Sequence, residues 1–251
     1  NNNNLATGGL NVVMTTTGAA TLSGVTDNNN GTYTATIKNA TAQAVVVSAT
    51  IADADVTDTV TVTFIAGDVD VTKSTLETTA AEVVADDTTT ATITLQAVDA
   101  NNNNLATGGL NVVMTTTGAA TLSGVTDNNN GTYTATIKNA TAEAVVVSAT
   151  IADADVTDTV TVTFIAGDVD VTKSTLETTA AEVVADDTTT ATITLQAVDA
   201  NNNNLATGGL NVVMTTTGAA TLSGVTDNNN GTYTATIKNA TAEAVVVYYA
   251  V

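Results

Sequence analysis

The sequence predicts an all-β protein built from tandem sandwich domains, and three observations support this prediction. Residues 101–200 repeat residues 1–100 with a single change, Gln43 to Glu143, and residues 201–247 begin a third copy. Many segments alternate apolar with polar residues, which is the period of a half-buried strand. The apolar residues are mostly Val and Ala, and Thr is abundant; the β-branched Val and Thr favour pleated sheet over helix. A period of this length matches a small domain that folds by itself.

One repeat, from Gly67 to Gly167, contains seven segments with the pattern of strands. Turn residues rich in Asp, Asn and Gly separate them. No amphipathic helix is visible, and we expect residues 77–85 to be loop or part of a strand. In chain order, the strands are expected at residues 69–76, 91–97, 110–114, around Leu122, and at 133–137, 145–151 and 160–164.

Each expected strand is justified by its own alternation. Val69 and Val71 open the first, and the second sets Ile93 and Leu95 between threonines. Every second residue is apolar in the third, fifth, sixth and seventh, while the fourth is short. Seven short strands in about 100 residues, with turns every 8–12 residues, are typical of an immunoglobulin-like sandwich.

This register divides the chain into three parts. Residues 68–167 form one complete sandwich of about seven strands. Residues 1–67 form an incomplete repeat without the first two strands, and residues 168–251 lack the last strand. The tail Tyr248–Val251 departs from the repeat, and the chain begins with Asn1, so we expect a window from a longer protein.

Five runs of one repeat are specific enough to suggest a family. The runs are Asp86–Leu95, Asp99–Asn101, Gly109–Val112, Asp127–Ile137 and Thr161–Phe164. They resemble the bacterial immunoglobulin-like repeats of invasin and intimin, which also occur in very large adhesins and biofilm proteins of Gram-negative bacteria. The resemblance implies tandem sandwiches on an extracellular surface protein. Two departures are the absence of Pro after the Asp-x-Asn motif and the absence of a terminal lectin-like domain.

The composition excludes several classes of function. The chain has five Lys, no Arg, no His and no Cys, which removes catalytic triads, thiol nucleophiles and arginine clamps, so we expect no enzyme. A net charge of −20 disfavours nucleic acid and anionic membranes as partners. No apolar run is long enough to insert into a membrane as a helix.

The carboxylates are the one constellation that could form a site. Following the strands up and down places acidic residues at both ends of each sandwich, so two acidic ends meet at every junction. A cation could bridge them, and Ca²⁺ prefers such oxygen ligands. The alternative is that these are solvated loop acids that keep the protein soluble. The predicted calcium ligands are Asp68, Asp70, Asp86, Asp87, Asp153, Asp155, Asp168 and Asp170.

The sequence thus predicts a structural stalk, a row of stiff modules that projects a binding domain from the cell. Its partners are neighbouring repeats of the same chain. One alternative is a filament or matrix subunit in which identical chains exchange strands; another is a calcium-dependent ligand-binding module. All three place the chain outside the cell or on its surface.

Overall fold

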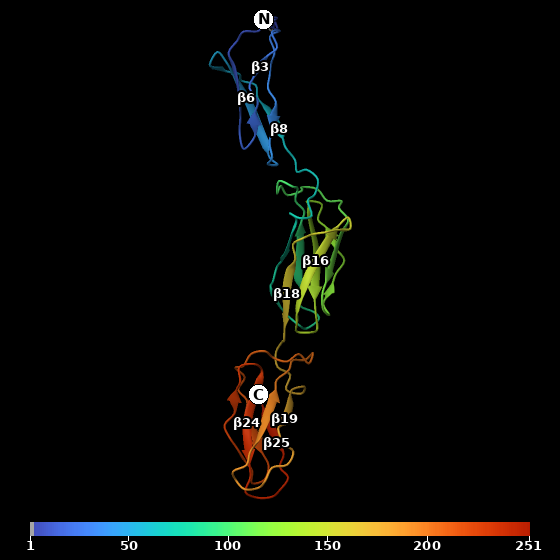
Figure 1. Ribbon diagram of the computed structural model, residues 1–251, viewed down its shortest axis with the longest axis vertical. Helices are drawn as coiled ribbons and strands as arrows, with labels where there is room; N and C mark the ends of the chain where they lie inside the picture. Colours follow the sequence, from blue (N-terminus) through green and yellow to red (C-terminus); the bar gives the residue numbers. More distant parts are fainter. Residues whose placement is uncertain (1–2) are drawn as a thin grey trace.

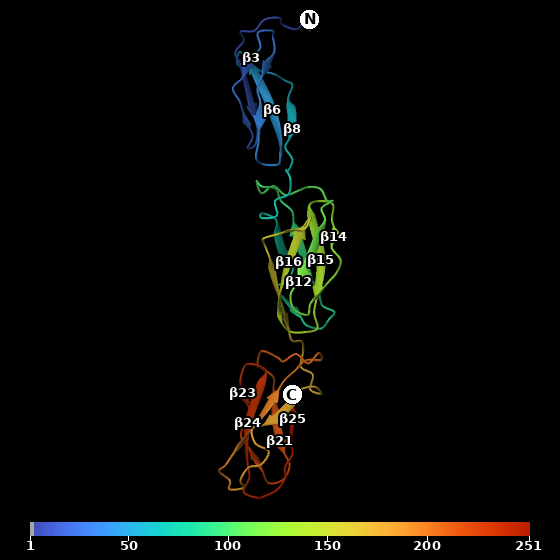
Figure 2. The same cartoon turned by 45° about the vertical axis from the view of Figure 1, so that its right-hand side comes forward.

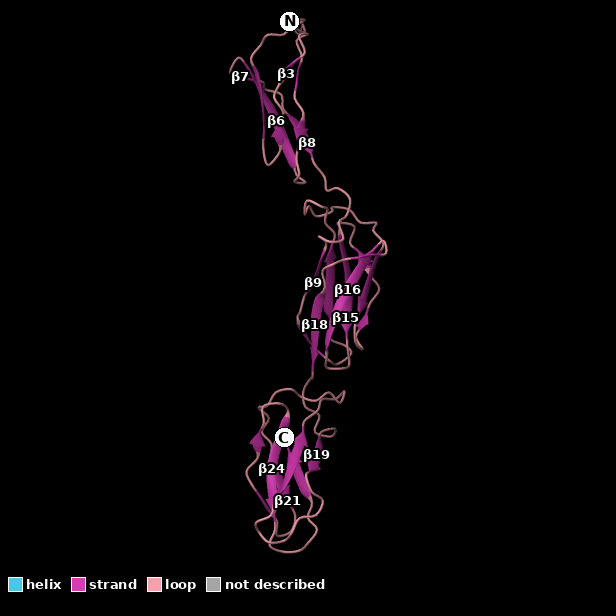
Figure 3. Ribbon diagram, in the orientation of Figure 1, coloured by secondary structure: helices cyan, strands magenta, loops and turns pink. Residues whose placement is uncertain are grey.

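The protein is an extended row of three β modules, seen end to end in Figures 1 and 2. The computed structural model describes residues 3–251. We name residues 3–67 module 1, residues 68–167 module 2 and residues 168–251 module 3. Strands and loops make up all of this described chain, as Figure 3 shows, which confirms the all-β fold class. Among the same residues, no helix is long and apolar enough to cross a membrane.

Module 2 is a sandwich of two five-stranded sheets. The first sheet has the order β10-β18-β16-β12, with the short β17 against β16, and β10 pairs with β18 in parallel. All its other pairs are antiparallel. Its strands are β10 (Glu82–Val84), β12 (Val112–Thr116), β16 (Ala144–Ile151), β17 (Ala154–Asp155) and β18 (Val160–Ile165).

The second sheet of module 2 is antiparallel throughout. Its order is β13-β15-β11-β9, and the short β14 also pairs with β15. The long central pair β11–β15 joins six residues of each strand. Its strands are β9 (Thr75–Thr78), β11 (Ala91–Gln96), β13 (Thr121–Leu122), β14 (Thr126–Asp127) and β15 (Thr132–Lys138).

The core lies between these two sheets, because alternate residues of each long strand point inward. Ile93 and Leu95 of β11 are buried against Val145 and Val147 of β16, and Phe164 of β18 lies in the same core. Buried Tyr133 needs a partner for its hydroxyl, and the backbone N–H of Leu110 donates to it at 3.0 Å. Period-two alternation in the sequence therefore predicted the core.

The structure corrects the first predicted strand. Residues 69–76 were expected to be one strand, but only Val69 forms an isolated bridge, and β9 begins at Thr75. The reason is Asp70, whose carboxylate accepts hydrogen bonds from the N–H and hydroxyl of Thr72 and holds the chain in a turn. The ambiguous residues 77–85 contain the end of β9 and all of β10. The segment between the expected strands 145–151 and 160–164 contains the short β17.

Module 1 contains counterparts of β12 to β18. Where module 2 has the continuous β15, module 1 has two short strands, because β15 depends on β11 for pairing and the described part of module 1 has no counterpart of β11. The strands are β1 (Val12–Thr16), β2 (Thr21–Leu22), β3 (Thr26–Asp27), β4 (Tyr33–Thr34), β5 (Ile37–Lys38), β6 (Ala44–Ile51), β7 (Ala54–Asp55) and β8 (Val60–Thr63).

Module 3 contains counterparts of β9 and β11 to β16. Its second sheet repeats that of module 2, and its own buried cluster surrounds Ile193, Leu195 and Tyr233. The described residues of module 3 include no counterpart of β10 or β18. The strands are β19 (Thr175–Thr178), β20 (Ala191–Gln196), β21 (Val213–Thr216), β22 (Thr221–Leu222), β23 (Thr226–Asp227), β24 (Thr232–Lys238) and β25 (Val247–Ala250).

Phe64 and Phe164 allow a test of the core assigned to module 2. Phe164 is 1 % exposed and Phe64 only half-buried, although the two stand in identical sequence. We expect Phe164→Ala to lower the free energy of unfolding of module 2 by about 3–5 kcal/mol. Phe64→Ala, in module 1, should cost clearly less. Urea unfolding of the full chain measures both, and equal losses would contradict the assigned core.

Candidate functional site: the junction between modules

A buried carboxylate organises the end of module 2 that faces module 1. Asp99 is 4 % exposed and lies in the turn after β11. Its Oδ1 accepts the N–H groups of Asn101 and Asn103 at 2.8 and 2.9 Å. Its Oδ2 accepts the N–H of Gly67, in the linker from module 1, at 2.9 Å. One side chain thus ties the linker to the turn.

Asn103 carries this arrangement across the junction. Its Nδ2 donates to Oδ2 of Asp99 at 2.9 Å and to the carbonyl of Ala40 in module 1 at 2.8 Å. Its Oδ1 accepts the N–H of Ala42 at 2.8 Å. The amide therefore pairs with the backbone of the preceding module through both its donor and its acceptor, as a neighbouring strand would.

The second junction repeats the first, one period later. Asn203 donates to the carbonyl of Ala140 at 2.9 Å and accepts the N–H of Ala142 at 2.8 Å. Asp199 again binds the linker, through the N–H of Gly167 at 3.0 Å. The same contacts at both junctions indicate that the geometry belongs to the repeat.

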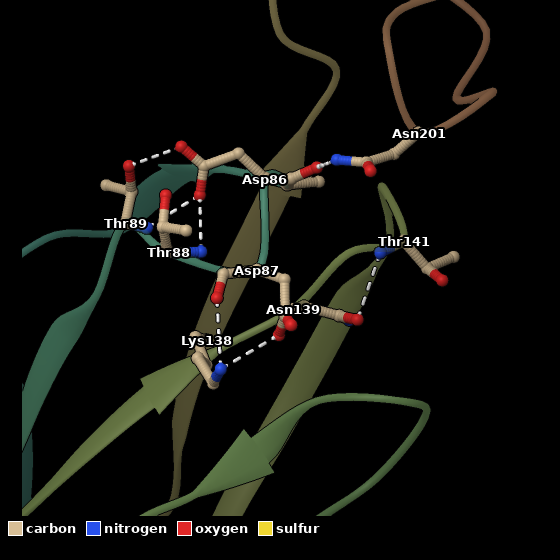
Figure 4. A network of polar contacts seen from close by, with 9 residues as sticks. Asp86, Asp87, Thr88, Thr89, Lys138, Asn139, Thr141 and Asn201 are labelled. Carbon is tan, nitrogen blue, oxygen red and sulfur yellow. Dashed lines mark hydrogen bonds and ion pairs between the residues drawn. The ribbon is translucent and has the colours of Figure 1, made fainter.

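The second junction has one further acceptor, the backbone carbonyl of Ala85. The Nδ2 of Asn201 donates to the carbonyl of Ala85 at 2.8 Å, at the end of β10 in module 2 (Figure 4). The amide of Asn203 also reaches this carbonyl, at 3.4 Å. Two asparagines of module 3 therefore contact two separate backbone segments of module 2. Two contacts restrict the orientation of module 3 relative to module 2 more than one contact would.

The surface that receives these asparagines is held in place by side chains of module 2, drawn in Figure 4. The Oδ1 of Asn139 accepts the N–H of Thr141 at 3.0 Å and so shapes the 139–142 turn. Lys138 forms an ion pair with Asp87 at 3.2 Å and also donates to its carbonyl at 3.0 Å. Asp86 accepts the N–H groups of Thr88 and Thr89 at 2.7 and 2.6 Å.

These hydrogen bonds shift the acidity of the carboxyl groups that receive them. The side-chain amide of Asn103, followed by the backbone N–H of Gly67, lowers the pKa of Asp99 to about 2. For Asp199 burial acts to raise the pKa, but hydrogen bonds from Asn203 and Gly167 outweigh it, so the pKa is lowered. Hydrogen bonds from the backbone and side chain of Thr89 lower the pKa of Asp86. These groups are therefore charged acceptors at neutral pH.

The eight predicted calcium ligands occupy several different turns. Asp70 and Asp170 bind Thr72 and Thr172 within their own turns. Asp86 accepts hydrogen bonds from Thr88 and Thr89, and Asp87 forms an ion pair with Lys138, all within module 2. Within residues 3–251, no group of three or more acidic side chains is arranged to hold a metal ion. Calcium binding stays a prediction. The exposed members are Asp68, Asp87, Asp153, Asp155 and Asp168.

Sequence reasoning missed the residues that make the junction, Asn103, Asn201 and Asn203. The run Asp-Ala-Asn-Asn-Asn at residues 99–103 was interpreted as turn residues and, in part, as a family motif, and not as a contact between modules. The available signal was the row of asparagines that follows the Asp after the second expected strand, at residues 99–103 and again at 199–203.

The fold and the junction define a class, that of tandem immunoglobulin-like sandwiches joined end to end. The family model described as "Invasin, domain 3" matches residues 1–67, 70–167 and 170–251. The chain therefore belongs to the invasin domain 3 family, which confirms the resemblance to invasin-type repeats. A search of curated proteins found no match.

Solved structures agree with this family. Invasin, described as a bacterial integrin-binding protein, is 27 % identical over 96 % of this chain and 50 % of its own, with a TM-score of 0.58. The Escherichia coli adhesin FdeC is 27 % identical over 100 % of this chain and 84 % of its own, with a TM-score of 0.62. InvD of Yersinia pseudotuberculosis, 23 % identical over 100 % and 76 % with a TM-score of 0.59, shares the fold. The chain thus spans half the length of the invasin structure.

Acid should weaken the turn that Asp99 holds. Because the pKa of Asp99 is lower in the folded protein than the ordinary 3.8, its contribution to stability is present above pH 3.8. The contribution is lost as the pH falls towards about 2. We expect Asp99→Asn to destabilise module 2 at neutral pH and to differ less from the wild type near pH 2. Thermal melting across this range tests it, with exposed Asp68→Asn as control; an unchanged difference would contradict the assignment.

The single difference between the first two repeats gives a second test. In module 2, Oε1 of Glu143 accepts Asn139 Nδ2 at 2.9 Å and Ala119 N–H at 2.7 Å. In module 1, the buried amide nitrogens of Asn39 and Gln43 have no partner in the described chain.

We therefore expect Gln43→Glu to raise the melting temperature of module 1 and Glu143→Gln to lower that of module 2. Hydrogen bonds lower the pKa of Glu143, so its advantage over Gln should be present at neutral pH and fade as the pH falls through its ordinary pKa of 4.5. Calorimetry of both variants measures this. The prediction is wrong if the two exchanges shift their modules in the same direction.

Proposed function

We propose that this chain is a spacer of a bacterial surface adhesin, which holds a binding domain away from the cell. The observation that carries the proposal is the junction: Asn103 and Asn203 pair with the backbone of the preceding module in the same way. A repeated, directed contact gives a row of modules a defined direction, whereas a flexible linker would let them turn freely. Similarity to invasin, described as an integrin-binding protein, and to FdeC, described as an adhesin, supports a place on the cell surface.

The shape of one module supports the same role. An eight-residue strand such as β16 extends about 26 Å, at about 3.3 Å per residue. The modules follow one another along a single long axis in Figures 1 and 2. Each further copy of the repeat therefore adds a few nanometres of projection. Catalysis forms no part of the proposal, since the sequence contains no His, Cys or Arg.

The test is to remove the junction asparagines and measure stiffness. Asn103→Ala with Asn203→Ala removes two hydrogen bonds from the first junction and three from the second, each worth about 0.5–1.5 kcal/mol. We expect a broader distribution of distances between spin labels on modules 1 and 3, and a smaller radius of gyration in X-ray scattering.

The matched control is Asn104→Ala with Asn204→Ala, which changes exposed asparagines of the same turns. It should leave the distances unchanged. If the junction variant is as stiff as the control, the asparagines do not set the shape of the spacer. The same measurement with Ca²⁺ and with a chelator tests the predicted calcium role. If Ca²⁺ stiffens the junction, the distribution of distances between the spin labels becomes narrower when Ca²⁺ is added.

A further inference from the structure

The segment that enters module 2 and the segment that leaves it run side by side along the module. We name residues 68–85 the entry segment and residues 157–165 the exit segment. The entry segment starts at the linker held by Asp99 and ends at Ala85, whose carbonyl accepts a hydrogen bond from Asn201 of module 3. The exit segment contains β18, which leads into module 3 (Figure 1). Both segments therefore run from the end that faces module 1 to the end that faces module 3.

Hydrogen bonds join the starts of the two segments. The backbone N–H of Thr157 donates to the carbonyl of Val71 at 3.3 Å, and its hydroxyl donates to the carbonyl of Thr72 at 3.1 Å. One residue later, Oδ2 of Asp158 accepts the N–H of Leu76 at 2.9 Å. The chain that has just entered the module is thus tied to the chain that is about to leave it.

A parallel ladder continues this connection towards module 3. β10 of the entry segment pairs with β18 of the exit segment over three residues of each strand. Next to this pairing, the N–H of Thr163 donates to the carbonyl of Ala81 at 2.8 Å, and the N–H of Ala85 donates to that of Ile165 at 2.8 Å. At least five hydrogen bonds therefore connect the two segments, spread from one end of the module to the other.

Tension along the row of modules acts on this connection in one particular geometry. Module 1 pulls the entry segment at its start, and module 3 pulls the exit segment at its end. Because the two segments run in the same direction, this tension makes them slide past each other. Hydrogen bonds that cross from one parallel strand to the other are then strained together. In an antiparallel pair pulled at its two outer ends, both ends would lie at the same edge, and the bonds would open one after another.

The route of the tension through module 2 is short. The entry segment supplies a strand to each sheet, β9 to the second sheet and β10 to the first. β9 pairs with β11, whereas β10 lies directly beside β18, the strand that continues into module 3. Tension therefore passes from β10 to β18 across their shared hydrogen bonds, and most other strands of the module feel it only after this connection breaks.

We propose that the connection between the entry and exit segments is a shear clamp, which keeps module 2 folded when the row of modules is pulled from its ends. Resistance to tension is a function beyond that of the spacer, because the spacer depends on contacts between modules and the clamp lies within one module. The clamp breaks before the remaining strands are strained. Its hydrogen bonds therefore set how long the module stays folded under force.

Single-molecule pulling on the full chain tests the clamp, and the direction of pulling is the first variable. The chain contains no Cys, so introduced cysteines give defined attachment points. Asp68→Cys with Asp168→Cys places them at opposite ends of module 2, and Thr90→Cys with Asp168→Cys places both at the end that faces module 3. All three side chains are exposed. At equal force, module 2 should stay folded about tenfold longer or more in the first arrangement, because several hydrogen bonds must break together.

A matched pair of substitutions gives the second test. Thr157→Val removes the hydroxyl that donates to Thr72 within the clamp. Thr115→Val removes the hydroxyl that bonds Ser148 at 3.1 Å, between β12 and β16 and outside the clamp. Both threonines are exposed, so urea unfolding should show similar small losses of stability without force. Under tension between the opposite ends of module 2, Thr157→Val should shorten the folded lifetime by about twofold to tenfold, and Thr115→Val by less than about twofold.

Two results would overturn the clamp. One is that module 2 unfolds equally fast in the two pulling directions, and the other is that the two threonine variants change the lifetime under force alike. Neither result would affect the spacer proposal, because the distances between modules 1 and 3 are measured without force. Loss of the defined distances in the wild-type chain would in turn leave the clamp intact.

Discussion

The structure depends on how each repeat uses one buried carboxylate. Asp99, and Asp199 in the next copy, accept N–H groups from their own turn and from the linker that enters the module. A buried charge is costly unless it is hydrogen-bonded, so the linker and the turn are held together by the need to satisfy it. The same carboxylate orients the amide of Asn103 or Asn203, which then contacts the preceding module. Fold, linker and junction are thus coupled through a single side chain.

The choice of an amide at the junction follows from the charge of the chain. With a net charge of −20, carboxylates facing each other across a junction would repel at close range. An amide carries a donor and an acceptor with no net charge, so it satisfies a backbone carbonyl and a backbone N–H together. The acids at the end of module 2 are engaged within their own module instead, as in the Lys138–Asp87 ion pair. The junction therefore forms without bringing like charges into contact.

The sequence predicted the sheets better than the site, for a physical reason. A strand such as β11 buries alternate residues, and that alternation is visible in the letters themselves. The start of β9 was misplaced, because whether Asp70 ends a strand or shapes a turn depends on a local hydrogen bond. Asn103 was missed because its partners are backbone groups of Ala40 and Ala42. Every residue type has a backbone carbonyl, so the identity of the partner residues gives no sign of the contact. The prediction selected the charged carboxylates as the site, whereas the contacts between modules are made by the neutral amides of asparagines.

Identical sequence in different surroundings shows how much of each strand is set by its partners. The residues of β15 form one continuous strand beside β11, whereas the same residues in module 1 form the short β4 and β5. The residues of β10 are ordered by β18, and their counterparts in module 3 form no strand. Strand propensity is equal in each pair, so the difference comes from pairing and burial.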